Sequence, residues 1–535
     1  MYLHLFAYFL VLGNVFRKRD WFWLFNAFIA SGLIEGTYAL FQRMGKIPSP
    51  QGGFRVDGTI GNPAYLAAFM IFIVGFSILL FLRTKNIYAR TYYAFSGWFS
   101  LAIIYFTASR GPVLGILIAL VSVGIGYLFF SAPQCGAGSL PDGRHGASGG
   151  KKVETDDDKK IKKILFGGLI GLVALVSILW GLKNNDFVKN SQTLSRLTSL
   201  SFSEKTITSR LSIWQMSFKA FKEKPILGWG PENYVVVFSK YYTPEMWRQE
   251  PWFDRSHNVI FDWLINAGIL GLLSYLSIFF FACRELYKNY LAKKISFGEF
   301  ILIVGIFVAY FFQNLFIFDQ IATYISFFAI LAWIYSVSAE EGMGKLANPA
   351  ERDARFRKAE FREKEKSAID INYFPVAAVL VFLVTFFYAY QINIKPYREN
   401  KYLINGIVSV SQNDLNAAFD YFQKAFDTNT FLGRDEVLGQ YINFILAIPR
   451  DPTISDDKKQ EIIQLAIKEL DNARTQNPMD PRPLMYSSLF YQTVGDSDKA
   501  IESLESARKI SPKKQDILSN LGKLYLGKKE YDKAL

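Results

Sequence analysis

The sequence predicts an all-α membrane protein, in which a polytopic helical domain is followed by a helical repeat domain. Hydrophobic residues make up 51% of the 535-residue chain and are clustered in runs, several of which exceed eighteen residues with few charges. A run of that length is long enough to cross a bilayer as an α-helix. The last part of the chain instead repeats its residue pattern at a fixed interval, which is typical of helical solenoids.

Ten apolar runs are predicted as membrane spans. They are residues 1–16, 21–42, 63–82, 92–108, 111–130, 164–182, 259–281, 300–318, 321–338 and 374–390. We therefore expect a membrane domain over residues 1–390, with a large loop at 183–258, and a separate tail over 391–535. Because Met1 runs straight into apolar sequence and Leu535 stops in mid-pattern, we expect a fragment at both ends.

The charge distribution predicts which loops lie in the cytoplasm. The formal net charge is +13, and much of the excess lies in short loops between apolar runs, such as Arg17–Arg19. Cytoplasmic loops of membrane proteins are enriched in Lys and Arg, so this charge does not indicate nucleic-acid binding. Alternating sides along the chain then places loop 183–258 and the tail on the extracytoplasmic side, although the basic loop with Arg43, Lys46 and Arg55 opposes this assignment mildly.

Neither the cysteines nor the acidic residues indicate a metal site. Cys135 and Cys283 are far apart and fall on predicted cytoplasmic loops, so they form no disulfide framework and no metal-ligand spacing. The acidic run Asp156–Asp158 lies in a Gly- and Lys-rich stretch, for which a solvated linker is the simpler interpretation. We expect no metal and no cofactor.

A polar cluster precedes the apolar run that starts at Val259. It consists of Asp254, Arg255, Ser256, His257 and Asn258, and His257 is one of only three histidines in the chain. Polar groups at the edge of a bilayer core are costly and are usually functional. The alternative is an interfacial anchor, in which Arg255 meets lipid phosphates and Asn258 caps the helix.

Loop 183–258 contains a predicted amphipathic helix. Apolar side chains recur three or four residues apart at Leu211, Trp214, Phe218 and Phe221. Thr208 or Ser209 is the expected cap, and Pro225 is expected to end the helix. Arg210 would then lie in the first turn, where the helix dipole disfavours a cation, and this indicates a bound anion. The alternative is a helix that lies on the membrane surface.

The tail repeats its pattern every thirty-four residues. Ala466 and Ala500 are separated by this interval, as are Leu470 and Leu504, Ala473 and Ala507, Pro478 and Pro512, and Tyr491 and Tyr525. This period resembles that of tetratricopeptide repeats, in which alanines let two helices pack closely. We expect the tail to fold without the membrane domain and to bind an acceptor or a protein partner.

Three features of the predicted extracytoplasmic side resemble the O-antigen ligase and polymerase superfamily. Arg110 and Leu114 match its Arg-x3-Leu motif at the end of a span, Arg210 matches its loop arginine, and His257 and Gly268 match its His-x10-Gly motif. The segments Gly58–Pro63, with Arg55 before it, and Gln313–Phe316 also resemble family segments. The likeness covers about residues 20–390.

The resemblance implies a GT-C-type helical enzyme of the bacterial inner membrane that transfers a glycan from a polyprenyl diphosphate to an acceptor hydroxyl. Arg110, Arg210 and Arg255 are the candidates for binding the donor diphosphate, because arginine forks bind phosphate oxygens in pairs. His257 is the candidate general base. We expect an inverting reaction that needs no metal.

Three residues have supporting roles in this interpretation, and the function keeps two alternatives. Asp254 would orient His257 or cap its helix, while Asn258 and Arg55 would support the site. The acceptor is a glycan, a lipid or a protein; in the last case the enzyme is a protein O-oligosaccharyltransferase. A non-enzymatic transporter or export scaffold is the other alternative, but the spans are poor in the mid-membrane charges that transport needs, with Glu35 and Glu299 the main exceptions.

Overall fold

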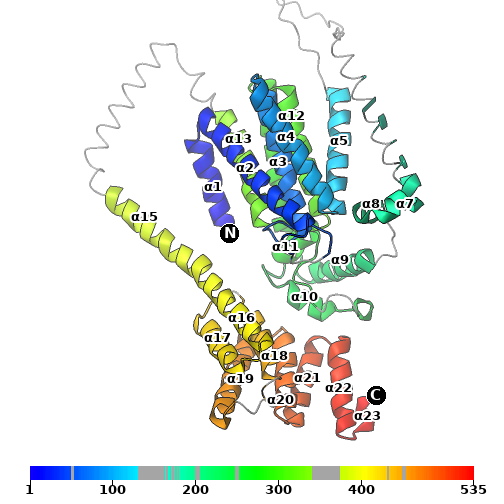
Figure 1. The fold of residues 1–535 in the computed structure, drawn as a ribbon, viewed down its shortest axis with the longest axis vertical. Coiled ribbons are helices and arrows are strands. Elements are labelled where there is room, and N and C mark those ends of the chain that lie inside the picture. Colours follow the sequence, from blue (N-terminus) through cyan, green and yellow to red (C-terminus); the bar gives the residue numbers. More distant parts are fainter. Residues whose placement is uncertain are drawn as a thin grey trace, which may run out of the picture. The chain divides into compact units, whose positions relative to one another are not determined.

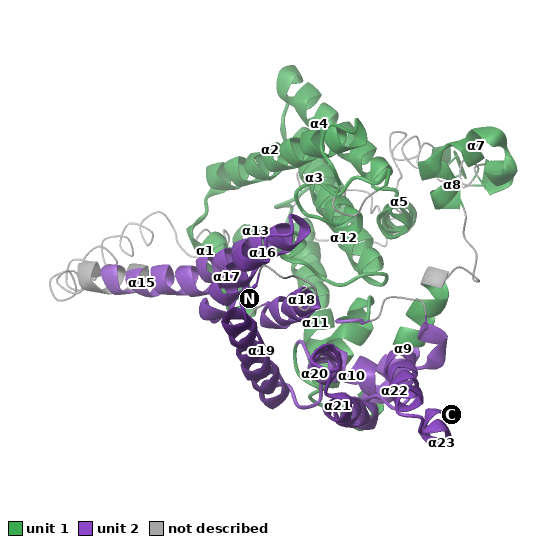
Figure 2. Cartoon of the chain, turned by 60° about the horizontal axis from the view of Figure 1, so that its bottom comes forward, with its two compact units in different colours: residues 1–214, 221–231, 255–346 green, residues 215–220, 232–254, 347–535 purple. Residues whose placement is uncertain are grey.

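The chain is all-helical in the computed structural model and divides into two compact units (Figures 1 and 2). The structure describes residues 1–49, 53–130, 163–198 in part, 205–247, 252–339, 374–430, 433–446, 448 and 454–535. Unit 1 comprises residues 1–214, 221–231 and 255–346, and unit 2 comprises residues 215–220, 232–254 and 347–535. The second unit therefore contains part of loop 183–258 together with the tail.

Unit 1 is a bundle of long apolar helices. Its main helices are α1 (Tyr2–Val15), α2 (Lys18–Arg43), α3 (Pro63–Arg83), α4 (Ile87–Phe106), α5 (Arg110–Phe130), α11 (Val259–Leu291), α12 (Phe297–Asn314) and α13 (Ile321–Ala339). Helix α3 is the central element, because 72% of its apolar window is buried inside the protein. It packs against α2, α4, α12 and α13 (Figure 1).

Six helices in the described part of the chain are long and apolar enough to cross a membrane: α2, α3, α5, α11, α12 and α13. They coincide with six of the ten predicted spans. Of the other four, residues 1–16 contain the shorter helix α1, residues 92–108 overlap α4 but extend past its end at Phe106, and 164–182 is described only in part. The last, 374–390, corresponds to α15 (Phe374–Ala389), which belongs to unit 2.

Local signals in the sequence account for where these helices begin. Asn62 caps α3 by accepting a hydrogen bond from the amide of Ala64, and Pro63 occupies the first helical position. Ser296 and Glu299 form a capping box at the start of α12. Glu299 also pairs with Arg83 at the end of α3, so one of the two acidic residues in the predicted spans is neutralised by a neighbouring helix.

The predicted span 259–281 is part of a longer helix that is interrupted. At Gly268 the backbone of α11 adopts φ 65° and ψ −162°, a conformation that only glycine adopts readily. The segment that follows helix α9 (Lys205–Glu223) fills this break: the amide of Ile269 donates to the carbonyl of Pro225 at 2.8 Å, and the amide of Trp229 donates to that of Ile265 at 2.6 Å. A Cβ atom on residue 268 would lie 2.1 Å from the Ile226 carbonyl oxygen. The glycine of the His-x10-Gly pattern thus lets two backbones touch.

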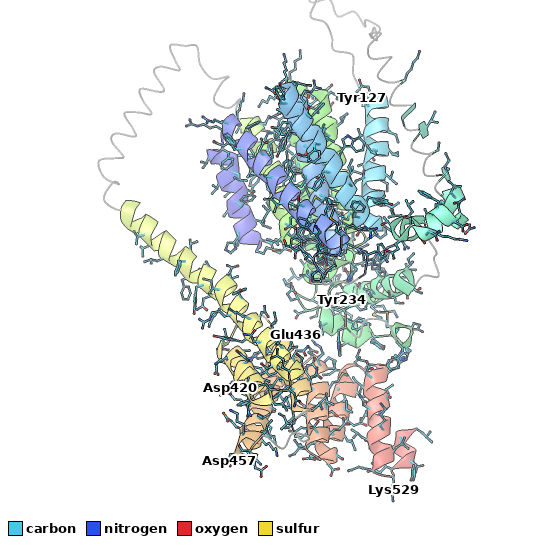
Figure 3. The ribbon with its side chains drawn as sticks, in the orientation of Figure 1. Tyr127, Tyr234, Asp420, Glu436, Asp457 and Lys529 are labelled. Carbon is cyan, nitrogen blue, oxygen red and sulfur yellow. The ribbon has the colours of Figure 1, made fainter. Side chains whose placement is uncertain are left out.

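Unit 2 contains short helix α10 (Tyr234–Tyr241) and the helices of the tail. The tail helices are α16 (Lys395–Ser411), α17 (Leu415–Asp427), α18 (Arg434–Ile445), α19 (Asp456–Gln476), α20 (Arg482–Thr493), α21 (Ser497–Ile510), α22 (Gln515–Gly527) and α23 (Tyr531–Ala534). They are amphipathic, with exposed charged residues such as Asp420, Glu436 and Asp457 (Figure 3).

The thirty-four-residue period of the tail relates α19 to α21 and α20 to α22. The paired positions Ala466/Ala500 and Leu470/Leu504 are buried in both copies. Neighbouring helices α20 and α21 pack on each other, as do α21 and α22. The assignment of these helices to the tetratricopeptide class stays a prediction.

We expect Gly268→Ala to destabilise unit 1 strongly, by about 3 kcal/mol or more, because the new methyl group meets backbone atoms and the conformation disfavours any side chain. The measurement is thermal unfolding of the full chain in detergent. Gly126→Ala is the matched control, since a Cβ atom there meets nothing within 4 Å. Equal melting temperatures for the two variants would contradict this role of Gly268.

Candidate active site

Polar loops meet at one end of the unit 1 helices. The Gln42 side chain, at the end of α2, donates to Asp57 and accepts from the amides of Asp57 and Gly58 in the loop before α3. At the end of α12, the Gln313 amide group donates to the Ala64 carbonyl of α3 at 3.0 Å. These buried bonds hold the loop between α2 and α3 against the ends of its neighbours.

Glu35, the other acidic residue noted in the predicted spans, contributes to the same loop. Its carboxylate accepts hydrogen bonds from the hydroxyl and from the amide of Thr59. Gly58 beside it has φ 62°, and a Cβ atom there would lie 2.6 Å from a Glu35 carboxylate oxygen. The charge of Glu35 therefore serves to fix a loop and does not line a path across the bundle.

Three arginines gather at this end of unit 1. Arg55 donates from Nε to the carbonyl of Thr107 at 3.0 Å and from an Nη atom to the hydroxyl of Ser109 at 2.9 Å. Arg110, at the start of α5, donates to the carbonyl of Arg196 at 2.7 Å, and Arg196 in turn donates to the carbonyl of Ala108 at 3.2 Å. Arg196 lies on the short helix α8 (Gln192–Thr198). The reciprocal bonds attach α8 to the turn between α4 and α5.

The electrostatic environment of Arg55 shows that positive charge is concentrated there. Burial, followed by the nearby charges of Arg196 and Arg110, lowers the pKa of Arg55 to about 10, and Asp57 offsets this only in part. The guanidinium is still charged at neutral pH, so the cluster carries mutually repelling cations. An anion bound among them would relieve that repulsion.

The motif around His257 has a fixed geometry. His257 has φ 53°, in the left-handed region, and its Nδ1 lies 3.2 Å from the carbonyl oxygen of Arg255. A carbonyl oxygen only accepts, so Nδ1 carries the proton in this arrangement and Nε2 is left as the proton acceptor. Asn258 is the N-cap of α11, the role that the alternative interpretation as an interfacial anchor gave it, and accepts from the amides of Ile260 and Phe261.

The loop between α12 and α13, residues 315–320, contacts this motif, and we call it the platform. The Asn258 side chain donates to the carbonyl of Leu315 at 3.0 Å. Phe318 meets the His257 ring edge-on at a centroid distance of 5.5 Å, and the Arg255 guanidinium lies 5.4 Å from the same ring. The platform also reaches α5, because a Cβ atom on Gly111, next to Arg110, would lie 3.7 Å from Phe316.

Asp319 lies in the platform and is bonded by side chains from both flanking helices, α12 and α13. Its carboxyl group is partly buried and accepts hydrogen bonds from Tyr310, from Asn314 at 2.6 Å and from Tyr324 at 3.1 Å. Burial raises the pKa of Asp319 to about 6, because loss of solvent outweighs these donors. The sequence analysis missed this residue, although a lone acidic residue between two spans, with tyrosines nine residues before it and five after it, is a signal that was present.

The other predicted site residues occupy different environments. Arg255 forms an ion pair with Asp262 at 3.1 Å, so a diphosphate would have to share it with a carboxylate. Asp254 is exposed and, because Asn258 is the N-cap, Asp254 does not cap α11.

The expected start of the helix that carries Arg210 was wrong. Helix α9 begins at Lys205, so Arg210 lies in its second turn and the argument from the helix dipole is weakened. The prediction placed the cap at Thr208 or Ser209 because these residue types favour caps, but the helix continues through both. Arg210 is nevertheless one turn before Trp214, whose indole donates to the carbonyl of Ser256 at 3.2 Å and whose ring stacks on Phe261. Side chains four apart share a helix face, so Arg210 lies on the face that contacts the His257 motif.

Arg196 is the second residue that sequence reasoning missed. It lies in a short polar stretch without periodicity, and only the fold brings it to the turn before α5. No pattern within loop 183–258 distinguishes it from the other arginines there.

An apolar groove of about 360 Å³ runs between α3, α5 and α12. Ile71, Ile116, Leu120, Leu302 and Ile306 are among its lining residues. On α5 the groove begins at Ile116, six residues from Arg110, which corresponds to about 9 Å along a helix. The groove is therefore lined by the same helix whose first residue belongs to the arginine cluster.

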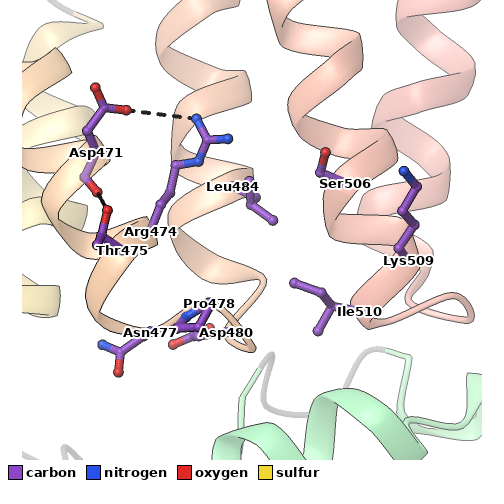
Figure 4. Close-up of a pocket in the computed structure, with 10 residues that line it drawn as sticks. All are labelled: Asp471, Arg474, Thr475, Asn477, Pro478, Asp480, Leu484, Ser506, Lys509 and Ile510. Carbon is purple, nitrogen blue, oxygen red and sulfur yellow. Dashed lines mark hydrogen bonds and ion pairs between the residues drawn. The ribbon is translucent and has the colours of Figure 1, made fainter.

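The tail has a cavity of its own, of about 610 Å³ (Figure 4). Its lining side chains are mostly polar and come from α19, from the turn after it, from Leu484 on α20 and from the end of α21. Within it Asp471 and Arg474 form an ion pair at 3.9 Å, and Lys509 lines the opposite side.

In the described ranges, no group of three or more His, Cys, Asp and Glu side chains is arranged to hold a metal ion. The molecule so far is a multi-span helical membrane protein with a cationic site and a histidine at one end of its bundle. Residues 95–276 match the sequence model of the O-antigen ligase family, and the chain therefore contains an O-antigen ligase domain. Curated proteins give no match to the sequence.

The match covers part of the predicted likeness. It includes Arg110, Arg196, Arg210 and the His257 motif, and it confirms the family resemblance over 95–276 of the expected 20–390. Arg55 and Asp319 lie outside the matched residues. The matched residues indicate a domain of the kind that transfers a glycan from a lipid-linked donor to an acceptor.

The raised pKa of Asp319 gives a pH prediction. Because the folded-state pKa of about 6 exceeds the ordinary value of about 3.9, protonation favours the folded state, and this stability is lost as the pH rises through 6. Between pH 7 and pH 5 we expect the wild-type chain to gain about 1 kcal/mol relative to Asp319→Asn. Thermal unfolding in detergent at both pH values measures the difference. Asp457→Asn, at an exposed carboxylate, should respond as the wild type does; an Asp319→Asn variant with the same pH response would refute the assignment.

Proposed function

We propose that this protein transfers a glycan from a polyprenyl diphosphate to an acceptor hydroxyl on the extracytoplasmic face of a bacterial inner membrane. The observation that carries the proposal is the O-antigen ligase domain, whose histidine and span-end arginine lie at the same end of one helix bundle. The orientation of that end rests on the basic residues at the opposite helix ends, such as Arg284 and Lys288 near the end of α11.

The arginine cluster is suited to a diphosphate. As the glycosidic bond breaks, negative charge grows on the leaving diphosphate and must be held in a poorly hydrated site. Arg55, Arg110 and Arg196 provide fixed cations at neighbouring positions, and the pKa of Arg55 is lowered first by burial and then by the charges of Arg196 and Arg110. The repulsion among these cations falls as the leaving group gains charge, so the cluster stabilises the transition state more than the ground state.

The apolar groove is suited to a lipid carrier. Its lining is almost entirely aliphatic, and it starts two turns from Arg110 along α5. A polyprenyl chain in this groove would lie along the spans while its diphosphate reached the cations. A soluble nucleotide-sugar donor would make no use of such a surface, so the groove supports a lipid-linked donor.

His257 supplies the base. With Nδ1 donating to the Arg255 carbonyl, Nε2 takes the proton of the acceptor hydroxyl as its oxygen attacks the anomeric carbon. The new C–O bond forms while the bond to the diphosphate breaks, and the bond electrons leave with the phosphate oxygen. A diphosphate needs no separate acid to depart. A single displacement of this kind inverts the anomeric centre.

The first test is His257→Ala in the full chain, reconstituted with a polyprenyl-diphosphate glycan and a hydroxyl acceptor. Loss of the base should lower the rate of glycan transfer about 10²–10⁴-fold. His4→Ala is the matched control, because His4 is an exposed histidine of α1. Wild-type transfer by the His257→Ala protein would remove the residue from the mechanism.

The second test separates the arginines of the cluster. Arg110→Ala and Arg196→Ala should each lower transfer about 10²-fold, because each removes one donor from a charged leaving group. Lysine at either position should restore activity only in part, since an ammonium lacks the paired fork. Arg284→Ala, at an exposed arginine of α11, is the control. Full activity of both lysine variants would show that charge alone is required, and full activity of both alanine variants would place the diphosphate elsewhere.

Analysis of the product distinguishes the acceptors. A longer glycan, a glycolipid and a glycosylated protein are separable by size and by protease treatment. Donor that is not consumed by the wild-type protein, with glycan crossing the membrane intact, would support the transporter alternative instead.

A further inference from the structure

The segment before the His257 motif is packed into the same unit as the tail. Residues 232–254, which we call the anchored segment, belong to unit 2 with residues 347–535 (Figure 2). At its start, the Tyr234 hydroxyl lies 2.8 Å from the Ser217 hydroxyl of α9. At its end, Phe253 is buried and packs on Phe238 at a centroid distance of 5.4 Å. The His257 motif, Arg255–Asn258, begins two residues later.

A lysine of the tail is enclosed by aromatic rings of this segment. Lys514, in the turn between α21 and α22, has a side chain that is only 1% exposed. Its Nζ lies 4.0 Å from the ring centroid of Trp252, 4.7 Å from that of Tyr242 and 5.7 Å from that of Phe238. These distances are within the range of cation–π attraction.

Burial makes the charge of Lys514 costly. It lowers the pKa of Lys514 to about 8, and Asp516, whose carboxylate lies 3.8 Å from Nζ, opposes the shift without cancelling it. The aliphatic stem of a lysine packs on apolar side chains and its ammonium is attracted to aromatic faces, so both parts of Lys514 contribute to this contact.

Hydrogen bonds reinforce the contact from the next residue. The hydroxyl of Tyr242 donates to the side-chain oxygen of Gln515 at 2.8 Å. The amide nitrogen of the same Gln515 side chain donates to the carbonyl of Pro244 at 3.1 Å. One side chain therefore binds two positions of the anchored segment.

The preceding turn of the repeat contacts the same tryptophan. Asp480 and Arg482 lie thirty-four residues before Lys514 and Asp516, so the two turns are equivalent in the repeat pattern. The guanidinium of Arg482 lies 5.9 Å from the ring of Trp252 and is fixed by hydrogen bonds to Asp480. Two successive turns of the tail thus each place a cation beside the ring of Trp252. The order of the acidic and basic residues is reversed between the turns, since Asp480 precedes Arg482 whereas Lys514 precedes Asp516.

We propose that the tail is a positioning element for the active site, and that Lys514 is the residue through which it fixes the anchored segment and hence the approach of the chain to His257. Lys514 does not touch substrate in this proposal, so it is a positioning residue and not a catalytic one. The role in transfer rests on the proposed function, whereas the anchoring itself does not.

Hydrogen exchange in the full chain tests the anchoring directly. In Lys514→Glu a buried anion replaces the cation against three rings and beside Asp516, and we expect amides of residues 234–247 to exchange at least about ten-fold faster. Trp252→Ala should give the same result. Lys514→Met keeps the stem and removes the charge, so it should retain most of the protection. Lys523→Glu, the same charge change at an exposed site of α22, is the control.

Transfer assays with the same variants test the positioning role. Lys514→Glu should lower kcat for glycan transfer about ten-fold or more, and Lys514→Met should restore it, while the affinity for donor stays near that of the wild type because the arginine cluster lies in unit 1. Unchanged protection in Lys514→Glu would overturn the anchoring. Lost protection with unchanged kcat would overturn the positioning role.

The two proposals fail differently. If the wild-type protein transfers no glycan, the proposed function fails, and the exchange experiment still decides whether Lys514 holds the anchored segment. If transfer proceeds and Lys523→Glu impairs it as much as Lys514→Glu does, the effect is one of surface charge and the proposal for Lys514 is wrong.

Discussion

The side chain of Asn258 connects the two parts on which the active-site end depends. Its oxygen accepts from the first amides of α11, and its nitrogen donates to the carbonyl of Leu315 in the platform. Both partners are backbone groups near the end of apolar helices, where an unpaired amide or carbonyl has little access to water and costs several kcal/mol. One amide side chain therefore satisfies a helix start and a loop, and it fixes their separation. His257 precedes it and Phe318 follows the loop carbonyl, so their edge-on contact depends on this bond.

Sequence patterns revealed the elements with a strong local signature. Six apolar runs and the capping chemistry of Asn258 were visible because run length and cap residues leave a local pattern in the sequence, whereas Gly268 was singled out only by its match to the His-x10-Gly motif. The reason for Gly268 was not visible: it lies in the close approach of the Pro225–Trp229 backbone, which is a tertiary contact. Arg196 was missed for the same reason, since its partner is a carbonyl eighty-eight residues away. The start of α9 was misplaced because good capping residues also occur inside helices.

The carboxylates at this end of unit 1 are bound by other protein groups. Asp319 is surrounded by tyrosines and Asn314, and Glu35 is bound by Thr59. Asp262 is paired with Arg255. A carboxylate placed freely among Arg55, Arg110 and Arg196 would neutralise them before a diphosphate arrived. Among the predicted arginines, Arg255 is consequently the one whose environment fits donor binding least. Its backbone carbonyl contributes to the site in another way, because it accepts from the His257 ring.

Because residues 232–254 belong to the same unit as the tail, removal of the tail would also affect the segment before the His257 motif. A tail that only captured an acceptor would end at its own helices, and the membrane domain would be indifferent to its loss. In this structure the rings of Phe238, Tyr242 and Trp252 pack around Lys514, so a chain ending after Tyr390 would expose three aromatic side chains in the segment that precedes the His257 motif. Exposed rings collapse onto other apolar surface, and the segment would lose its fixed path. The repeat helices thus have a physical reason to remain covalently attached to the domain that carries the His257 motif.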